Sequence, residues 1–261
     1  MISLDELLQM NKDERAEYLY EKAEKLGKRL NPEYEEFIKL NPEYTYYYAK
    51  DIIKGRWKEA EPHIIKDPKW ACNYAEDIIK DRWLEAESYI IKDAHWATYY
   101  AINVIKQRWP EVEPIMLRDD NSKMLYWYAY YIIKDRWREA EEYIKKDSYY
   151  AGMYAVNIIE DRWREAEETI INGDIFWASY YATNILNKRL PEIEDRLIEN
   201  PNWAFRYWSH FFSEPWEKLE KGILKFDLGV LEKYVERLQK LGYKVKLLTT
   251  FNKKDVIDED L

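Results

Sequence analysis

The sequence is poor in the residues that build disulfide frameworks, metal sites and irregular loops. Its 261 residues include one cysteine, Cys72, together with three histidines, seven glycines and nine prolines. A single cysteine excludes a disulfide within the chain and argues against a thiolate metal centre. So few glycines and prolines exclude a loop-rich or disordered chain. The remaining composition is typical of a helical protein with an ordered core.

Long apolar runs and an excess of basic residues are also lacking. No segment approaches the roughly 18 apolar residues that are needed to cross a bilayer. The first residues, MISLDELLQMNKDERAEYL, are acidic where a signal peptide would be basic. We therefore expect a cytoplasmic protein without membrane contact. The net charge of -9 argues against a general nucleic-acid binder, because such proteins draw most of their affinity from a basic surface.

Aromatic residues, by contrast, are abundant, with 24 Tyr and 12 Trp, and they reveal an internal repeat. An Arg-Trp pair recurs at steps of 26 to 28 residues, and an Arg-Leu pair extends the series at each end. Such regular spacing is the signature of a repeat architecture. Trp216 keeps the tryptophan position in a last, degenerate copy, where Pro215 replaces the arginine. The pairs are Arg56-Trp57, Arg82-Trp83, Arg108-Trp109, Arg136-Trp137 and Arg162-Trp163, with Arg29-Leu30 and Arg189-Leu190 at the ends.

The copy from Asp67 to Asp93 shows the expected first helix of the unit. Asp67-Pro68 is a helix start, because Asp caps free N–H groups and Pro tolerates the first turn. Apolar residues at helical spacing follow over about 13 residues. We place Arg82 in the last turn, where a cation suits the helix dipole.

A second, shorter helix of about nine residues follows Trp83. Glu85 and Glu87 suit its N-terminus. In other copies Pro62 and Pro114 fall further inside this helix, so we expect an irregular first turn there. Two such helices cannot bury their apolar stripes alone, whereas stacked copies can. The sequence therefore predicts an all-α fold, a right-handed αα-solenoid of about eight helix-turn-helix repeats of ~26 residues.

The ends of the array differ from its middle and predict three regions. Residues 1–30 form an N-terminal cap and the first repeat helix, with a capping box made by Asn11 and Glu14. Residues 31–225 form the solenoid. Residues 226–261 form a C-terminal capping helix and an acidic tail, in which residues 243–250 (YKVKLLTT) alternate like a strand.

The repeated unit, YAxxIIKxRWxEAExxIIKD, resembles repeat arrays in hypothetical proteins of tailed bacteriophages. Those arrays read roughly YAxxVIKGRWPEAExYIxKDPxxA. The matches run from Tyr48-Ala49 to Asp67 and from Tyr74-Ala75 to Asp93, and the resemblance covers about residues 12–225. It implies a viral origin and a bacterial cytoplasm as the location, but it implies no activity.

Catalytic and cofactor signatures are missing. The sequence contains no Walker A loop, GxGxxG, HExxH or GxSxG motif. His63, His95 and His210 fall at unrelated positions of different copies, and Cys72 has no basic neighbour that would activate its thiol. We therefore expect no enzyme activity, no catalytic residue, no metal and no cofactor.

A pair of glutamates recurs at the start of the second helix. We interpret these pairs as compensation of the helix dipole combined with pairing to the arginines. The alternative is an acidic ladder that mimics a nucleic-acid backbone. The pairs are Glu59/Glu61, Glu85/Glu87, Glu111/Glu113, Glu139/Glu141 and Glu165/Glu167.

One stripe of the first helix varies between copies and predicts the binding surface. It comprises the positions -2, +1, +2 and +5 relative to a repeated alanine, which share one helix face. In the middle copies the stripe becomes aromatic and apolar, as interaction sites often are. The predicted partner-binding residues are Tyr99, Ile102, Lys106, Trp127, Tyr130, Tyr131, Lys134, Met153 and Val156.

These observations favour a phage-encoded binding protein whose partner is a host or phage protein. The expected purpose is to inhibit or sequester a host protein, such as one of the host's defence proteins. Three alternatives stay open. The aromatic residues could stack on nucleic-acid bases while a column of lysines contacts the phosphates, or a pocket between repeats could sequester a small ligand. The patch could also pack inside the protein, under the C-terminal tail or under the insertion at residues 120–123. The strand-like tail also leaves a homodimer open.

Overall fold

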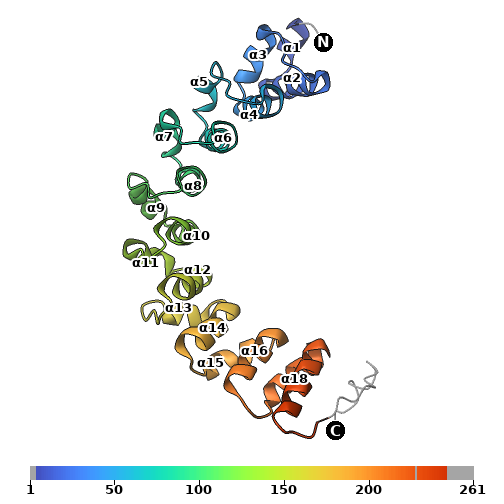
Figure 1. Ribbon diagram of the computed structural model, residues 1–261, viewed down its shortest axis with the longest axis vertical. Helices are drawn as coiled ribbons and strands as arrows, with labels where there is room; N and C mark the ends of the chain where they lie inside the picture. The colour runs from blue at the N-terminus through green and yellow to red at the C-terminus, as the bar shows by residue number, and fades with distance from the viewer. Residues whose placement is uncertain (1–3, 227, 246–261) are drawn as a thin grey trace. The chain divides into compact units, whose positions relative to one another are not determined.

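The computed structural model describes residues 4–226 and 228–245, and every regular element within them is a helix (Figure 1). The predicted all-α repeat solenoid is thereby confirmed. The chain forms two compact units, Met1–Ile144 and Lys145–Leu261, and each is described by itself. None of the described helices is both long enough and apolar enough to cross a membrane.

The first unit holds the copies up to the fourth Arg-Trp pair, Arg136-Trp137. Its first helices (α6, α8 and α10) lie side by side in one row, and the short second helices (α7, α9 and α11) form a row beside them (Figure 1). The elements are α1 (Leu4–Gln9), α2 (Lys12–Leu26), α3 (Pro32–Lys39), α4 (Pro42–Tyr47), η1 (Tyr48–Ile53), α5 (Glu61–Ile64), α6 (Pro68–Tyr74), η2 (Ala75–Ile79), α7 (Leu84–Ile90), α8 (Ala94–Tyr100), η3 (Ala101–Ile105), α9 (Glu113–Asp119), α10 (Ser122–Tyr128), η4 (Ala129–Ile133) and α11 (Arg138–Ile144).

The second unit continues the same alternation and ends with two longer helices. Its elements are α12 (Ser148–Tyr154), η5 (Ala155–Ile159), α13 (Glu167–Asn172), α14 (Ile175–Tyr181), η6 (Ala182–Leu186), α15 (Pro191–Leu197), α16 (Pro201–Phe211), α17 (Glu217–Phe226) and α18 (Leu228–Lys240). Helix α18 occupies the region of the predicted C-terminal capping helix. Of the predicted strand, Tyr243–Val245 form neither helix nor strand, and the remainder lies outside the described residues.

The first helix of a copy changes from an α-helix to a π-helix halfway along its length. In the third copy, seven α-helical residues (α6) run into five π-helical residues (η2). The helix then ends at Lys80, which has a left-handed backbone with φ 59° and donates its N–H to the Ala75 carbonyl at 2.7 Å. Residues other than glycine rarely adopt this conformation, and six copies repeat it at Lys54, Lys80, Lys106, Lys134, Glu160 and Asn187.

This wide final turn corrects two predictions. Arg82 does not lie in the last turn of the first helix but beyond Lys80, the residue that caps it. Likewise, Lys106 and Lys134 occupy the left-handed cap position, so they do not continue the stripe of the helix face. The spacing rule used for the stripe assumes an α-helix throughout, and a π-helical turn holds more residues than an α-helical one.

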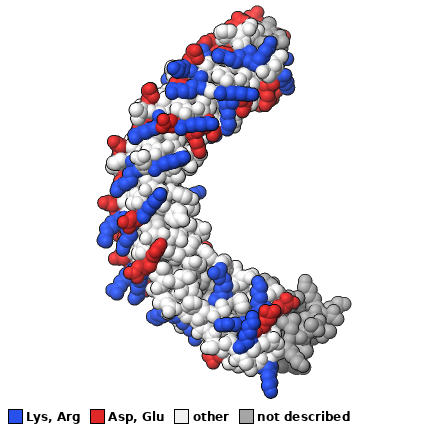
Figure 2. Space-filling model, in the orientation of Figure 1, with Lys and Arg blue, Asp and Glu red and all other residues white. Residues whose placement is uncertain are grey.

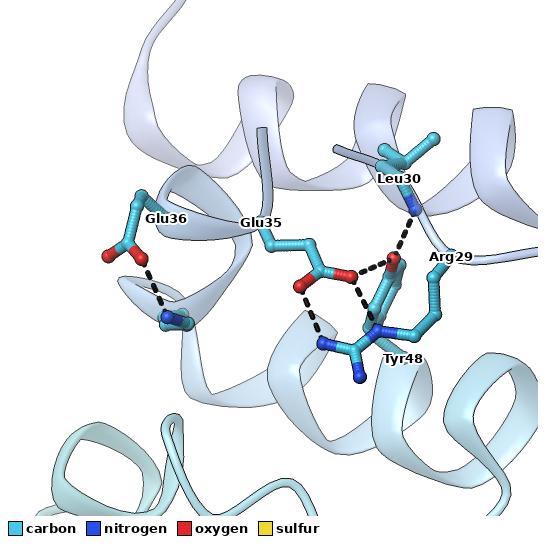
Figure 3. A network of polar contacts seen from close by, with 6 residues as sticks. Arg29, Leu30, Glu35, Glu36 and Tyr48 are labelled. Atoms are coloured by element: carbon cyan, nitrogen blue, oxygen red, sulfur yellow. Dashed lines mark hydrogen bonds and ion pairs between the residues drawn. The ribbon is translucent and has the colours of Figure 1, made fainter. Parts of the chain in front are cut away.

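A hydrogen-bonded frame joins neighbouring copies within each unit, and Figure 3 shows its first example. The Tyr48 hydroxyl accepts the buried N–H of Leu30 and donates to Glu35, both at 2.7 Å. Glu35 in turn accepts two hydrogen bonds from the Arg29 guanidinium, at 2.7 and 2.9 Å. Burial opposes ionisation of Glu35, but the bonds from Arg29 and Tyr48 outweigh burial and lower its pKa.

The same tyrosine bond recurs along the chain. In each case the tyrosine hydroxyl accepts a hydrogen bond from the backbone N–H of a Trp or Leu and thereby satisfies a buried donor. That Trp or Leu directly follows the repeated arginine, and in the last copy it follows Pro215. Burial raises the pKa of Tyr207 to about 12, so the hydroxyl stays protonated. The pairs are Trp57–Tyr74, Trp83–Tyr100 and Trp109–Tyr128 in the first unit, and Trp163–Tyr181, Leu190–Tyr207 and Trp216–Tyr234 in the second.

The core of both units is built from this frame and from the repeated alanines. Trp57 and Trp163 are 1% exposed, and Tyr74, Tyr181 and the alanine column are fully buried. The repeated isoleucine pairs, such as Ile78-Ile79, are only half-buried, which corrects their predicted role as core residues. They lie in the π-helical turn.

The predicted helix starts are largely confirmed. Asn11 and Glu14 form the capping box, and Asp67 caps α6 through the Trp70 N–H. Where a proline falls inside the second helix, the regular helix begins later: α5 begins at Glu61 and α9 at Glu113, each after an irregular turn.

Candidate functional site

The largest of the grooves described here lies in the first unit, between the first helices of the fourth and fifth copies. It has a volume of about 670 Å³, and we call it the aromatic groove. Figure 2 shows that charged side chains gather over α7 and α9, whereas the surface over α8 and α10 is mostly uncharged. The groove is lined by His95, Thr98, Tyr99, Ile102, Asn103, Asn121, Lys123, Met124, Trp127 and Tyr131.

The repeat itself explains why these residues meet. The frame tyrosines Tyr100 and Tyr128 point into the core and are fully buried. Residues next to a frame tyrosine along the helix, such as Tyr99 and Trp127, therefore lie on the neighbouring face. Residues one turn away from them on the same face, such as Tyr131, complete the wall.

The aromatic side chains of the groove support one another. Trp127 stacks on Tyr131, with ring centroids 5.4 Å apart and an angle of 17° between the rings. Tyr130 lies edge-on to Tyr131 at 5.1 Å and stacks at 5.8 Å on Tyr126, which is 1% exposed. Tyr130 and Tyr131 remain 42% and 49% exposed. Such stacked and edge-on pairs are favourable ring geometries, so the groove offers a preformed apolar surface.

Most polar groups of the lining already have partners. The Tyr99 hydroxyl donates to Glu76 at 2.6 Å. Burial raises the pKa of Tyr99, and the bond to Glu76 raises it further. The Asn103 amide donates to the Tyr99 carbonyl, and the Thr98 hydroxyl donates to the Ala94 carbonyl. These bonds fix the walls and leave few donors or acceptors for a polar ligand.

Two exposed basic groups, Lys123 and His95, stand at the rim of the groove. No acidic side chain belongs to the lining. Among the described residues, no carboxylate forms an ion pair with Lys123. The groove therefore combines an apolar floor with a basic rim, although the chain as a whole is acidic.

The structure brings together four of the residues predicted from the sequence: Tyr99, Ile102, Trp127 and Tyr131. Tyr130 adjoins them through Tyr131. Lys106 and Lys134 do not line the groove, because both cap the ends of their helices. Met153 and Val156 lie on α12 and η5 of the second unit, where both are half-buried.

The sequence reasoning missed five residues of the groove: His95, Thr98, Asn121, Lys123 and Met124. They precede the repeated alanines by between three and eight residues and therefore lie before the predicted stripe. A stripe extended towards the N-terminus of each helix would have included them. The insertion near residues 120–123 contributes Asn121 and Lys123 to the wall. Beside this insertion, Tyr130 and Tyr131 of the patch remain 42% and 49% exposed.

The recurring glutamate pairs serve the frame. The second member of each pair, such as Glu87, forms a bidentate ion pair with the repeated arginine five residues earlier. The first member, such as Glu85, is exposed. The predicted arginine pairing is confirmed at Glu61, Glu87, Glu113, Glu141 and Glu167.

Cys72 and the candidate metal-ligating side chains can be placed among the described residues. Burial raises the pKa of the Cys72 thiol, which donates to the Trp96 carbonyl at 3.3 Å, so the thiolate nucleophile is disfavoured. Within residues 4–226 and 228–245, no group of three or more His, Cys, Asp or Glu side chains is placed to hold a metal ion.

Two further grooves lie between successive helices. An acidic groove in the first unit is lined by Glu17, Tyr20, Glu21, Glu24, Tyr44 and Tyr47 and measures about 290 Å³. A polar groove in the second unit measures about 260 Å³. Comparison of the chain with protein-family models, with curated proteins and with solved structures finds no match.

Proposed function

We propose that this chain is a non-catalytic binding protein whose aromatic groove takes a large apolar side chain from a protein partner. The observation that carries the proposal is the groove itself: about 670 Å³, walled by Tyr99, Ile102, Met124 and the stacked pair Trp127–Tyr131. Pockets that bind apolar anchors have this composition. Rigid Trp and Tyr side chains are the residues that most often dominate binding energy at interfaces.

The rim indicates the chemistry of the partner. Lys123 and His95 stand beside the apolar floor, and no acidic group lines the groove. A partner segment that carries an acidic residue next to its apolar anchor would therefore match both features. The exposed rings of Tyr130 and Tyr131 extend the apolar surface beyond the groove, which suits a macromolecule better than a small ligand.

The arrangement favours a protein over a nucleic acid. Stacked rings could hold bases, but binding of a strand also needs a basic path for the phosphates. The lysine column expected to form that path consists of Lys54, Lys80, Lys106 and Lys134. None of these residues lines the groove, and the net charge is -9. The resemblance of the repeat to phage arrays supports a host or phage protein as the partner, bound in the bacterial cytoplasm, with inhibition or sequestration as the outcome.

The test begins with quantitative capture from bacterial lysate. The wild-type chain is compared with the triple variant Trp127→Ala/Tyr130→Ala/Tyr131→Ala and with Tyr149→Ala. Tyr149 is a matched control, because it is 44% exposed and lies outside the aromatic groove. We expect a stoichiometric protein that the wild type and Tyr149→Ala retain and the triple variant loses.

The purified partner then separates this proposal from its rivals. In titration calorimetry, the triple variant should lose at least about 2 kcal/mol of binding free energy. Lys123→Glu should weaken binding more at low than at high salt, because the rim charge is solvent-exposed. An affinity unchanged in the triple variant, with its thermal melt intact, would contradict the placement of the site.

A further inference from the structure

The polar groove of the second unit has a chemistry that the aromatic groove does not explain. It lies between α14–η6 and α16 and is lined by Ser179, Tyr180, Thr183, Asn184, Trp203, Arg206, Tyr207, Ser209 and His210. Its place in the repeat matches that of the aromatic groove. Arg206 directly precedes the frame residue Tyr207, as Trp127 precedes Tyr128. The repeat therefore presents a second groove of the same construction.

The charge of this groove is uncompensated. No Asp or Glu belongs to its lining. The arginines of the frame each bind a glutamate, as Arg189 binds Glu194. Arg206 is exposed, and it forms no ion pair with any described carboxylate. Its guanidinium instead lies over the Trp203 ring, 5.0 Å from the centroid, an arrangement that holds the planar group while its N–H edge stays open.

Most of the other polar groups cannot donate to a ligand. The hydroxyls of Ser179, Thr183 and Ser209 donate to backbone carbonyls of their own helices. The Asn184 amide donates to the Tyr180 carbonyl and to the Thr183 hydroxyl. These bonds leave the Arg206 guanidinium as the main donor, together with the Tyr180 hydroxyl, which has no partner among the described residues.

One further nitrogen faces the groove. His210 lines it, and its Nε2 lies 2.9 Å from the Asn187 side-chain oxygen. That contact fixes the ring and leaves Nδ1 as the second polar atom. The groove therefore presents one permanent cation, one phenol and one imidazole, without a carboxylate that would neutralise them.

We propose that the polar groove binds a carboxylate, and specifically the acidic side chain of a partner protein. A guanidinium accepts a carboxylate through two parallel hydrogen bonds. A phosphoryl group is usually held by a cluster of arginines, and this groove has one. Its volume of about 260 Å³ is below the range typical of drug-sized ligands and suits a single side chain. This inference stands apart from the aromatic groove, because the two grooves belong to different units.

The test uses nuclear magnetic resonance on the full chain with three peptide probes that differ at one position. The peptides are acetyl-Ala-Glu-Ala-amide, its Gln counterpart and its phosphoserine counterpart. The Nε–H signal of Arg206, assigned by its loss in Arg206→Gln, and the indole N–H signal of Trp203 report on the groove. We expect the Glu peptide to shift both signals saturably and the Gln peptide to leave them in place.

Two variants make the result specific. Arg206→Gln should weaken binding of the Glu peptide at least about tenfold, the effect of losing a hydrogen bond to a charged group. Arg164→Gln is the matched control, because Arg164 is also exposed in the second unit but lies outside this groove; its binding should equal that of the wild type. Equal shifts with the Gln peptide, or no shift with the Glu peptide, would overturn the site. Tighter binding of the phosphoserine peptide would overturn the choice of carboxylate.

Discussion

The aromatic groove and the polar groove occupy the same place in the repeat and share a tyrosine (Tyr99, Tyr180) and an asparagine (Asn103, Asn184) on one wall, but they differ on the opposite wall. Trp127 in one corresponds to Arg206 in the other, since each precedes a frame tyrosine. Tyr131 corresponds in the same way to His210, three residues after that tyrosine. The backbone arrangement therefore does not determine what a groove binds.

The difference follows from the burial and hydrogen bonding of each position. Frame residues such as Tyr128 and Tyr207 are at most 1% exposed and satisfy a buried N–H group, so a change there removes a bond that water cannot replace. Groove residues such as Tyr131 and Arg206 are exposed, so a change there costs little stability. A repeat of this kind can vary its binding chemistry while its fold is retained.

The largest expected loss of stability tests whether the same tyrosine hydrogen bond stabilises each of the two units. Tyr100→Phe in the first unit and Tyr181→Phe in the second each remove a hydroxyl that accepts a buried N–H, from Trp83 and Trp163 respectively. We expect each variant to lose about 1–3 kcal/mol of unfolding free energy, the cost of an unsatisfied buried donor. Chemical denaturation followed by circular dichroism measures this loss.

Tyr131→Phe supplies the control for that comparison. Its hydroxyl belongs to a side chain that is 49% exposed, so its stability should stay within about 0.5 kcal/mol of the wild type. A loss of stability in only one of the two variants would mean that this hydrogen bond stabilises one unit and not the other.

A smaller effect separates the frame glutamates from the exposed ones. The hydrogen bond from Arg162 lowers the pKa of Glu167, and Glu165 is exposed. A carboxylate whose pKa is lowered by folding adds stability above its unfolded pKa of about 4.3. It loses that stability as the pH falls through the lower folded value. Glu167→Gln should therefore lower the free energy of unfolding by up to about 1 kcal/mol at pH 7.

The two variants Glu167→Gln and Glu165→Gln also test how the stability depends on pH. The difference between wild type and Glu167→Gln should shrink as the pH falls below about 4, where the carboxylate takes up a proton. Glu165→Gln should track the wild type throughout. Thermal melts at several pH values check both, and a constant difference across the range would contradict the pairing as its cause.

The fold could be predicted from the sequence because its repeated residues are those that carry the packing. The Arg-Trp spacing, the repeated alanines and the Asp and Asn caps all indicate paired helices in each copy, although the second helices are four to seven residues long and not the expected nine or so. The π-helical turn escaped prediction, because an i, i+3, i+4 pattern also fits an α-helix. That turn displaced Arg82, Lys106 and Lys134 from their expected places.

The frame hydrogen bond and the second groove were not predicted either. A tyrosine follows the Trp or Leu of each copy by 17 to 19 residues, and Tyr234 follows Trp216 by 18. This spacing is visible in the sequence, but its meaning depends on which face of the next helix turns inward. Likewise, Arg206 was not recognised, because only the structure shows that it lacks a carboxylate partner.

An exchange of residues between the two grooves is the sharpest test of their comparison, and it should change the stability least. Arg206→Trp/His210→Tyr gives the polar groove the aromatic pair of the other groove, and Trp127→Arg/Tyr131→His does the reverse. Arg206, His210 and Tyr131 are exposed and Trp127 is half-buried, so we expect each double variant to stay within about 1 kcal/mol of the wild type. A neutral apolar dye such as Nile red, followed by fluorescence, should bind the wild type through its aromatic groove. The first exchange should add a second dye site and abolish the response to the Glu peptide, and the reverse exchange should abolish the original dye site. If dye binding were the same in all three proteins, groove chemistry would depend on features other than these two positions, and the separation of frame from groove residues would fail.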